Sequence, residues 1–312
     1  DGVSFGSKFY DKGILAQKFT FEVMPQYSSV NKNLVGKMNF SLLMNNENKN
    51  NYATVFNFFA SSYHYDEALR YQVFRPALSF YFRTDDFRLN SRHLLGIYYF
   101  DVRREKTKDS NANPNYKVIN LRHLYSNRGA IKHLTLDTNF QFADKFSKVE
   151  FEFDIRRLLP SGSQVTARFF IGKFLNHSSR QTNFFDFNLN RPQDYLFRYN
   201  YFGRSEDKGF YSQQIVMAEG GFKSTHSRAT ANDYLLSANI TLGLWKWIEA
   251  YGEIGSLKNI REKVHTFFGS GIRLNIIPDY LELYFPFLSS NGWEINQENY
   301  ERKIRFVLTL NT

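Results

Sequence analysis

The sequence has no cysteine among its 312 residues, and this absence excludes disulfide bonds and thiolate metal sites. It has only seven prolines. It also has no run of about 18 apolar residues, the length that a membrane-crossing helix needs. None of its seven histidines precedes a glutamate, so the zinc-binding motif His-Glu-x-x-His is absent. Helical membrane spans, disulfide scaffolds and that class of zinc peptidase site are therefore excluded for this segment.

Aromatic residues are abundant instead. The sequence holds 33 phenylalanines and 20 tyrosines, and the aromatic content reaches 18%. Aromatic side chains favour β-strands. The mean hydropathy is nevertheless negative, at -0.47. A membrane-spanning barrel combines these properties, because alternate residues of each strand face lipid and a polar interior.

Two segments near the middle of the chain alternate between polar and apolar residues. Residues 133–142 have one polar face and one largely apolar face. In the next segment the charged residues are Glu150, Glu152, Asp154 and Arg156, and the apolar residues between them are Phe151, Phe153 and Ile155. A period of two residues indicates a strand, because a helix would mix the two faces.

Similar segments predict sixteen strands in all. We place them at residues 16–27, 33–44, 51–62, 70–82, 92–104, 116–127, 133–142, 150–156, 163–175, 182–190, 209–219, 233–244, 247–257, 264–276, 279–287 and 302–311. Most have the roughly 9–11 residues that a tilted strand needs to cross the hydrocarbon layer. We therefore predict an all-β fold, a transmembrane antiparallel β-barrel of about 16 strands at residues 16–312, after a lead-in segment at residues 1–15. A soluble β-sandwich or lipocalin-like barrel is the alternative, although sandwich strands usually have about 5–6 residues.

The formal net charge is +10, but the basic residues are spread along the chain. We therefore expect no nucleic-acid partner, and expect contacts with outer-membrane lipids and lipopolysaccharide. Glu150, Glu152 and Asp154 could in principle hold a cation or act as acid and base. Opposite Arg156 and Arg168, such carboxylates more often form a solvated ladder of charges in the barrel interior. No cofactor, metal ligand or catalytic residue is predicted within this segment.

Three segments near the end of the chain resemble a known family. They are Phe268-Gly269-Ser270-Gly271-Ile272-Arg273-Leu274, Leu281-Glu282-Leu283-Tyr284-Phe285-Pro286 and Lys303-Ile304-Arg305-Phe306-Val307-Leu308-Thr309-Leu310. They resemble the C-terminal end of barrels in the outer-membrane assembly factor superfamily, which includes BamA and TamA (the bacterial surface antigen family). The resemblance implies a sixteen-stranded barrel in the cell outer membrane.

A second set of motifs extends over nearly the whole chain. Its members are Asp1-Gly2 with Phe9-Tyr10, Lys32-Asn33-Leu34-Val35-Gly36, Asp194-Tyr195-Leu196-Phe197, Gly203-Arg204-Ser205-Glu206, Ser212-Gln213-Gln214 and Glu219-Gly220-Gly221-Phe222-Lys223. Together they look like the barrel that follows an aminopeptidase N-like (gluzincin) metallopeptidase domain in some Gram-negative bacteria. The resemblance implies a barrel without catalysis that anchors or positions an upstream metallopeptidase-like domain. Other outer-membrane or periplasmic proteins are expected partners, and the lack of a signal peptide agrees with an upstream region.

One departure from the assembly factors concerns their sixth outer loop. They carry Val-Arg-Gly-Phe/Tyr there, whereas this chain has the sequence Gly220-Gly221-Phe222-Lys223, which we name the sixth-loop motif. The arginine has no counterpart in it. Insertase activity by that mechanism is therefore in doubt, although the loop can still fold into the interior.

Two rival functions remain open. A component of protein insertion or translocation machinery would open sideways at a seam between its first and last strands. The predicted seam residues are Phe19, Phe21 and Val23 on the first strand and Ile304, Phe306 and Leu308 on the last. A passive channel is the other rival, and its interior charges would set the selectivity.

Overall fold

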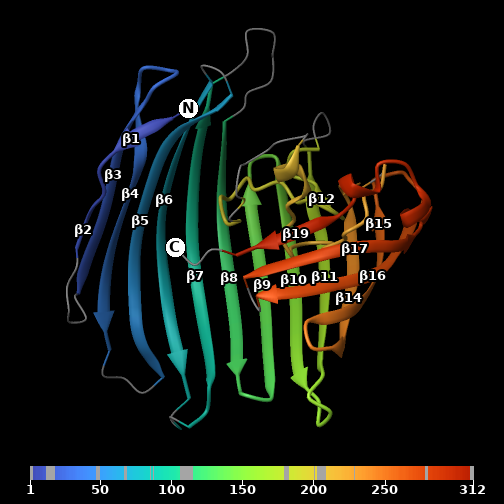
Figure 1. Ribbon diagram of the computed structural model, residues 1–312. Coiled ribbons are helices and arrows are strands. Elements are labelled where there is room, and N and C mark those ends of the chain that lie inside the picture. The colour runs from blue at the N-terminus through green and yellow to red at the C-terminus, as the bar shows by residue number, and fades with distance from the viewer. Residues whose placement is uncertain are drawn as a thin grey trace. The chain divides into compact units, whose positions relative to one another are not determined.

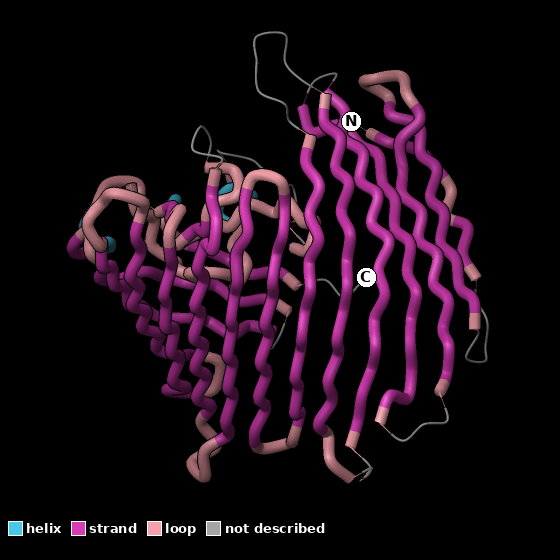
Figure 2. Tube along the Cα trace, turned by 180° about the vertical axis from the view of Figure 1, so that it is seen from behind, coloured by secondary structure: helices cyan, strands magenta, loops and turns pink. Residues whose placement is uncertain are grey.

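The computed structural model describes residues 3–11, 18–46, 50–66, 69–84, 86, 88–105, 115–178, 183–199, 201, 209–227, 229–277 and 280–309. Strand accounts for most of this length, and helix only for a few short turns (Figure 2). No helix in these ranges is long and apolar enough to cross a membrane. The chain forms two compact units, and each is described by itself. Unit 1 comprises Asp1–Tyr125 and Asn139–Ser147, and unit 2 comprises Ser126–Thr138 and Lys148–Thr312.

Unit 1 is a series of long antiparallel strands (Figure 1). Its strands are β1 (Ser4–Gly6), β2 (Phe9–Tyr10), β3 (Phe19–Ser28), β4 (Leu34–Asn45), β5 (Asn51–Asp66), β6 (Leu69–Arg83) and β7 (Ser91–Arg104). Each of β3 to β6 pairs with the strand that follows it. The short strands β1 and β2 pair with β3 on its other side, so part of the predicted lead-in segment belongs to the sheet. Three further strands contribute residues to both units: β8 (Tyr116–Arg128), β9 (Lys132–Ala143) and β10 (Phe146–Leu158).

Unit 2 continues the antiparallel pattern. Its strands are β11 (Gln164–His177), β14 (Tyr234–Trp245), β15 (Ile248–Lys258), β16 (His265–Ile277), β17 (Leu281–Ser289), β18 (Gly292–Trp293) and β19 (Arg305–Leu308). They pair in the order β11, β14, β15, β16, β17, and β17 then pairs with both β18 and β19. Outside this sheet lie β12 (Phe187–Asn188), β13 (Thr230–Ala231) and the 3-10 helices η1 (Phe210–Gln213), η2 (Glu294–Asn296) and η3 (Tyr300–Arg302).

The predicted all-β fold class is confirmed, and 17 strands belong to one large sheet. Two predicted strands are wrong. Residues 182–190 contribute only the two-residue strand β12, and residues 209–219 form the short helix η1 followed by irregular chain. The last predicted strand, at 302–311, is also shorter than expected, because only Arg305–Leu308 pairs with β17. The connection between β11 and β14 is therefore a single long one.

The strands have their apolar face outward and their polar face buried. On β14, Leu236, Ile240 and Leu242 are exposed, whereas Ser237, Asn239 and Thr241 between them are buried. The other unit has the same arrangement, since Phe56 on β5 is exposed and the neighbouring Asn57 donates to Asn39 Oδ1 at 2.8 Å and Ser41 Oγ at 2.8 Å. Exposing this much apolar surface to water is unfavourable at about 25 cal/mol per Å². The arrangement is typical of strands that face lipid.

Replacing Ile240, which is 50% exposed in the middle of β14, by arginine tests this assignment. On a lipid-facing strand the charge should lower the free energy of unfolding by about 2–4 kcal/mol, whereas an ordinary water-exposed site changes by less than about 0.5 kcal/mol. Denaturant titration of protein folded into lipid vesicles measures the difference. The matched control is Ile131→Arg in the turn between β8 and β9, which should be nearly neutral. Equal effects at the two positions would contradict the lipid-facing assignment.

Candidate functional site

The long connection between β11 and β14 folds against the polar face of unit 2. We name the described parts of residues 183–231 the docked segment. Its strands β12 and β13 pair with each other, with Phe187 opposite Ala231. Phe187, Leu189 and Phe222 are fully buried. The segment thus brings a small apolar core of its own to a sheet face that is otherwise lined by polar side chains.

Glycines on the sheet provide the recesses that receive this core. A Cβ atom on Gly172 of β11 would lie 2.6 Å from the ring of Phe187, and one on Gly255 of β15 would lie 2.9 Å from the ring of Phe222. Such distances are too short for a side chain. The sequence therefore carries glycine where the aromatic rings of the docked segment approach the strands most closely.

The sixth-loop motif lies within the docked segment and is held through its backbone. The guanidinium of Arg168 on β11 donates to the carbonyl oxygen of Glu219 at 2.7 Å. Asn239 on β14 donates to the carbonyl of Gly220 at 3.3 Å, and the amide of Phe222 donates to the carbonyl of Leu189 at 2.9 Å. The structure therefore brings together Arg168, predicted as an interior charge, and the sixth-loop motif.

Lys223 ends the motif and forms its main charged contact. Its Nζ lies 3.1 Å from Glu253 Oε2 on β15 and donates to the carbonyl of Gly221 at 2.8 Å. The ammonium also lies 5.4 Å and 5.2 Å from the ring centroids of Tyr251 and Tyr284. Burial lowers the pKa of Lys223, and the nearby carboxylate of Glu253 opposes that shift. A buried lysine thus occurs within the sixth-loop motif.

A second buried lysine fastens the docked segment to β10. Lys148 Nζ lies 4.2 Å from the ring centroid of Phe187 and 5.1 Å from that of Tyr195, both in the docked segment. The same ammonium pairs with Glu150 at 3.1 Å, and Glu150 also pairs with Arg198 at 3.5 Å. The predicted interior residue Glu150 therefore acts together with Lys148, two positions earlier on the same strand face.

The side chain of Glu219 is enclosed between β10 and the docked segment. Burial raises its pKa to about 7, while the cation of Lys148 opposes the shift. Its carboxyl oxygen accepts a hydrogen bond from the amide of Asn188. Because the pKa lies near neutrality, this carboxyl is divided between its neutral and ionised forms at about pH 7.

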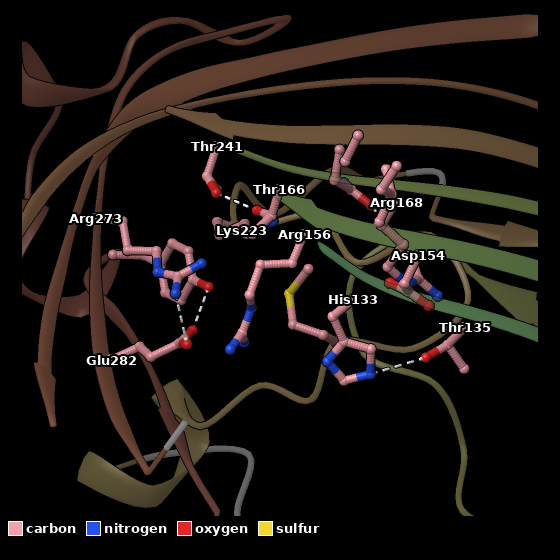
Figure 3. A pocket seen from close by; sticks show the side chains of 15 residues that line it. His133, Thr135, Asp154, Arg156, Thr166, Arg168, Lys223, Thr241, Arg273 and Glu282 are labelled. Atoms are coloured by element: carbon pink, nitrogen blue, oxygen red, sulfur yellow. Dashed lines mark hydrogen bonds and ion pairs between the residues drawn. The ribbon is translucent and has the colours of Figure 1, made fainter. Parts of the chain in front are cut away.

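A cavity of about 220 Å³ lies beside the motif. Figure 3 shows the charged side chains around it, and these are Asp154, Arg156, Arg168, Lys223, Arg273 and Glu282. Arg168 pairs with Glu152, and Arg273 pairs with Glu282 at 2.8 Å and Glu249 at 3.4 Å. Charges of both signs thus line the cavity, and three of the predicted interior residues, Asp154, Arg156 and Arg168, are among them. Among the described residues, no group of three or more histidine, aspartate or glutamate side chains is placed to hold a metal ion.

Comparison with known proteins gives a likeness at the level of structure. No family model matches the sequence. No curated protein matches it either. The chain is similar to a solved structure of BamA from Haemophilus ducreyi lacking POTRA domains 1–3, with 11% sequence identity and a TM-score of 0.49. The match covers 91% of this chain and 65% of that one, so this chain spans less than two thirds of the solved chain.

Five of the six predicted seam residues lie within strands, and the sixth lies next to one. Phe19, Phe21 and Val23 are in β3, which belongs to unit 1. Phe306 and Leu308 are in β19, and Ile304 directly precedes it, all in unit 2. The pairing of these two strands stays a prediction.

Several residues of the site escaped sequence reasoning. They are Lys148, Glu219, Glu249, Glu253 and Arg273. Two signals were present: Lys148 continues the alternation of Glu150 and Glu152, and Glu249 and Glu253 are four residues apart on one strand face. Alternation identifies a polar face but not the partner of each charge, because the partners come from distant segments.

Lys223→Met should destabilise the docked segment, because it leaves the carboxylate of Glu253 buried without its cation. Removing one partner of a buried pair costs about 3–5 kcal/mol of the free energy of unfolding, and Lys223→Met with Glu253→Leu should restore most of it. Denaturant titration in vesicles and limited proteolysis of the segment measure the change. The control is Lys173→Met, whose pair with Asp233 is half-exposed and should contribute less than about 1 kcal/mol. A Lys223→Met loss no larger than this control would refute the role given to the pair.

Proposed function

We propose that the chain is a β-barrel of the cell outer membrane that anchors and positions an upstream metallopeptidase-like domain and performs no catalysis itself. The observation that carries this proposal is the docked segment. The docked segment covers the polar strand face of unit 2. Such a protein is suited to hold a domain at the membrane rather than to conduct solutes.

Two features support the membrane part of the proposal. The exposed side chains of long strands such as β11 and β14 are apolar, including Phe169, Ile171 and Ile240. Exposed aromatic residues lie at strand ends, among them Trp245 and Trp247 on either side of Lys246. Tryptophan near a membrane interface favours the headgroup region, and lysine there attracts anionic lipid. Outer-membrane lipids and lipopolysaccharide are thus the proposed surroundings of the strands.

The docked segment favours an anchor over a passive channel. A channel needs hydrated polar side chains along its path. On unit 2 the polar residues Lys148, Arg168 and Glu253 instead contact the docked segment and are at least nine-tenths buried. Moving the segment would take the cation of Lys223 away from Glu253 and the carbonyl of Glu219 away from Arg168, so the docked position is the stable one.

The metallopeptidase link is supported by the sequence resemblance. Three of its motifs fall in the docked segment: Asp194-Tyr195-Leu196-Phe197, Ser212-Gln213-Gln214 and Glu219–Lys223. Tyr195, Leu196, Gln214 and all of Glu219–Lys223 are buried there. A further motif, Gly203-Arg204-Ser205-Glu206, lies outside the described residues.

In planar lipid bilayers the wild-type chain should give no steady conductance. A variant in which residues 183–231 are replaced by a short Gly-Ser linker should conduct in discrete steps, because the polar face is then hydrated. A linker inserted at the exposed turn residues Ser161 and Gly162 provides a control for general damage and should stay silent. Steady conductance of the wild type, equal to that of the deletion variant, would favour a passive channel.

The complete gene product should contain His-Glu-x-x-His upstream of residue 1, and its peptidase activity should sediment with outer membranes. A stop codon before the barrel should release that activity into the soluble fraction. Replacing the glutamate of the motif by glutamine should abolish activity without changing sedimentation. Periplasmic repeat domains in place of a peptidase would contradict the anchor proposal and favour insertion or translocation machinery.

A further inference from the structure

The cavity beside the sixth-loop motif is lined by unit 2 alone, and the docked segment forms part of its wall. Met217 and Lys223 come from that segment, and the other lining residues come from β9, β10, β11, β14, β16 and β17. Its volume of about 220 Å³ equals that of about seven water molecules at roughly 30 Å³ each. Pockets for drug-sized ligands have about 300–1,000 Å³. The space therefore suits a small solute and is too small for a lipid or a polypeptide segment.

Positive groups outnumber negative groups on the walls of this cavity. The lining includes four cations and two carboxylates, which are Arg156, Arg168, Lys223 and Arg273, with Asp154 and Glu282. Glu282 accepts hydrogen bonds from Arg273 at 2.8 Å and from the hydroxyl of Tyr284 at 2.6 Å. The other carboxylates that pair with these cations, Glu152, Glu249 and Glu253, are not part of the lining. A solute in the cavity thus meets an excess of positive charge.

Arg168 lines the cavity and is buried, but it does not use all of its donors. Its Nη1 donates to the carbonyl of Glu219 at 2.7 Å and to Asn239 Oδ1 at 3.2 Å, and its Nη2 donates to Glu152. The Nε atom has no hydrogen-bond partner within the described part of the chain, although the side chain is only 6% exposed. A buried donor without a partner is unfavourable by about 1–3 kcal/mol. A solute oxygen in the cavity can accept a hydrogen bond from this group.

Arg156 and Lys223 bring cations to the cavity from two different parts of the fold. Figure 3 shows the guanidinium of Arg156 in the space between His133 and Glu282. Arg156 lies on β10 and is only partly buried, so a solute can reach it. Lys223 belongs to the docked segment and is almost fully buried. An anion bound between these two side chains therefore joins the docked segment to the sheet.

We propose that the cavity binds a small oxyanion, a solute that carries a carboxylate or a phosphate group, and that the bound anion stabilises the docked position of the segment. Arg156 and Arg168 hold the anion from the sheet, and Lys223 holds it from the segment. Guanidinium groups suit this chemistry, because their paired N–H donors match the oxygens of both carboxylate and phosphate. The inference goes beyond anchoring, because it gives the polar interior of unit 2 a ligand. It does not depend on the metallopeptidase part of the proposed function.

Calorimetric titration of the chain in lipid nanodiscs measures the binding, with inorganic phosphate, succinate and glycylglycine as separate probes. The three probes distinguish a phosphate, a simple carboxylate and a carboxylate that comes with an ammonium group. At least one of them should bind with one-to-one stoichiometry and protect the docked segment from limited proteolysis. Sodium chloride at the same ionic strength should not, because it only screens charges. Absence of saturable binding by every probe up to about 10 mM, about ten times a Kd of 1 mM, would overturn the proposal.

Arg156→Gln should weaken binding of the probe by about tenfold or more, because it removes charge-assisted hydrogen bonds to the anion. Arg157→Gln is the matched control and should leave the affinity unchanged, because Arg157 is exposed on the same strand and is not part of the lining. Arg156→Lys keeps the charge without the paired donors, so its affinity should lie between the two. Heat-modifiable mobility shows that each variant is folded. Equal affinities of Arg156→Gln and Arg157→Gln would refute the assignment of the site.

Discussion

The cost of burying an unpaired charge governs the arrangement of unit 2. Its polar strand face holds Lys148, Arg168 and Glu253 in positions with little access to water. Each of them finds a partner, and in every case the docked segment supplies all or part of it. Removing the segment would leave several such groups unsatisfied at once, so the fold of the sheet and the position of the segment depend on each other.

The sheet binds the docked segment partly through backbone atoms of the segment, and these contacts do not require particular side chains there. Arg168 binds the carbonyl of Glu219 rather than its side chain, and Asn239 binds the carbonyl of Gly220. What these contacts require is a chain that can approach the strands closely, which glycine permits. The loop therefore docks without an arginine of its own, and the charge of Lys223 comes from the end of the motif.

The period of two residues was enough to predict the long strands, because alternate side chains of a strand face different surroundings. It failed at 182–190 for a related reason. Phe185, Phe187 and Leu189 alternate there and are buried, but they belong to a segment that is mostly not strand. The charges of the site were predictable as a polar face, as Glu150 and Arg168 illustrate. Their pairing was not, since Lys223 and Glu253 meet only through the tertiary fold.

The docked segment also contacts the terminal strand. Arg305 on β19 donates to the carbonyl of Lys223 at 3.3 Å, directly next to the buried ion pair. Burial alone would raise the pKa of Glu294, but hydrogen bonds from Lys303 and Ser289 hold that pKa below its usual value and tie the chain before β19 to β17. With four residues, β19 is much shorter than the roughly 9–11 that a full crossing needs. The strand must then be stabilised by these lateral contacts. A substitution that destabilises the sixth-loop motif should therefore also destabilise β19.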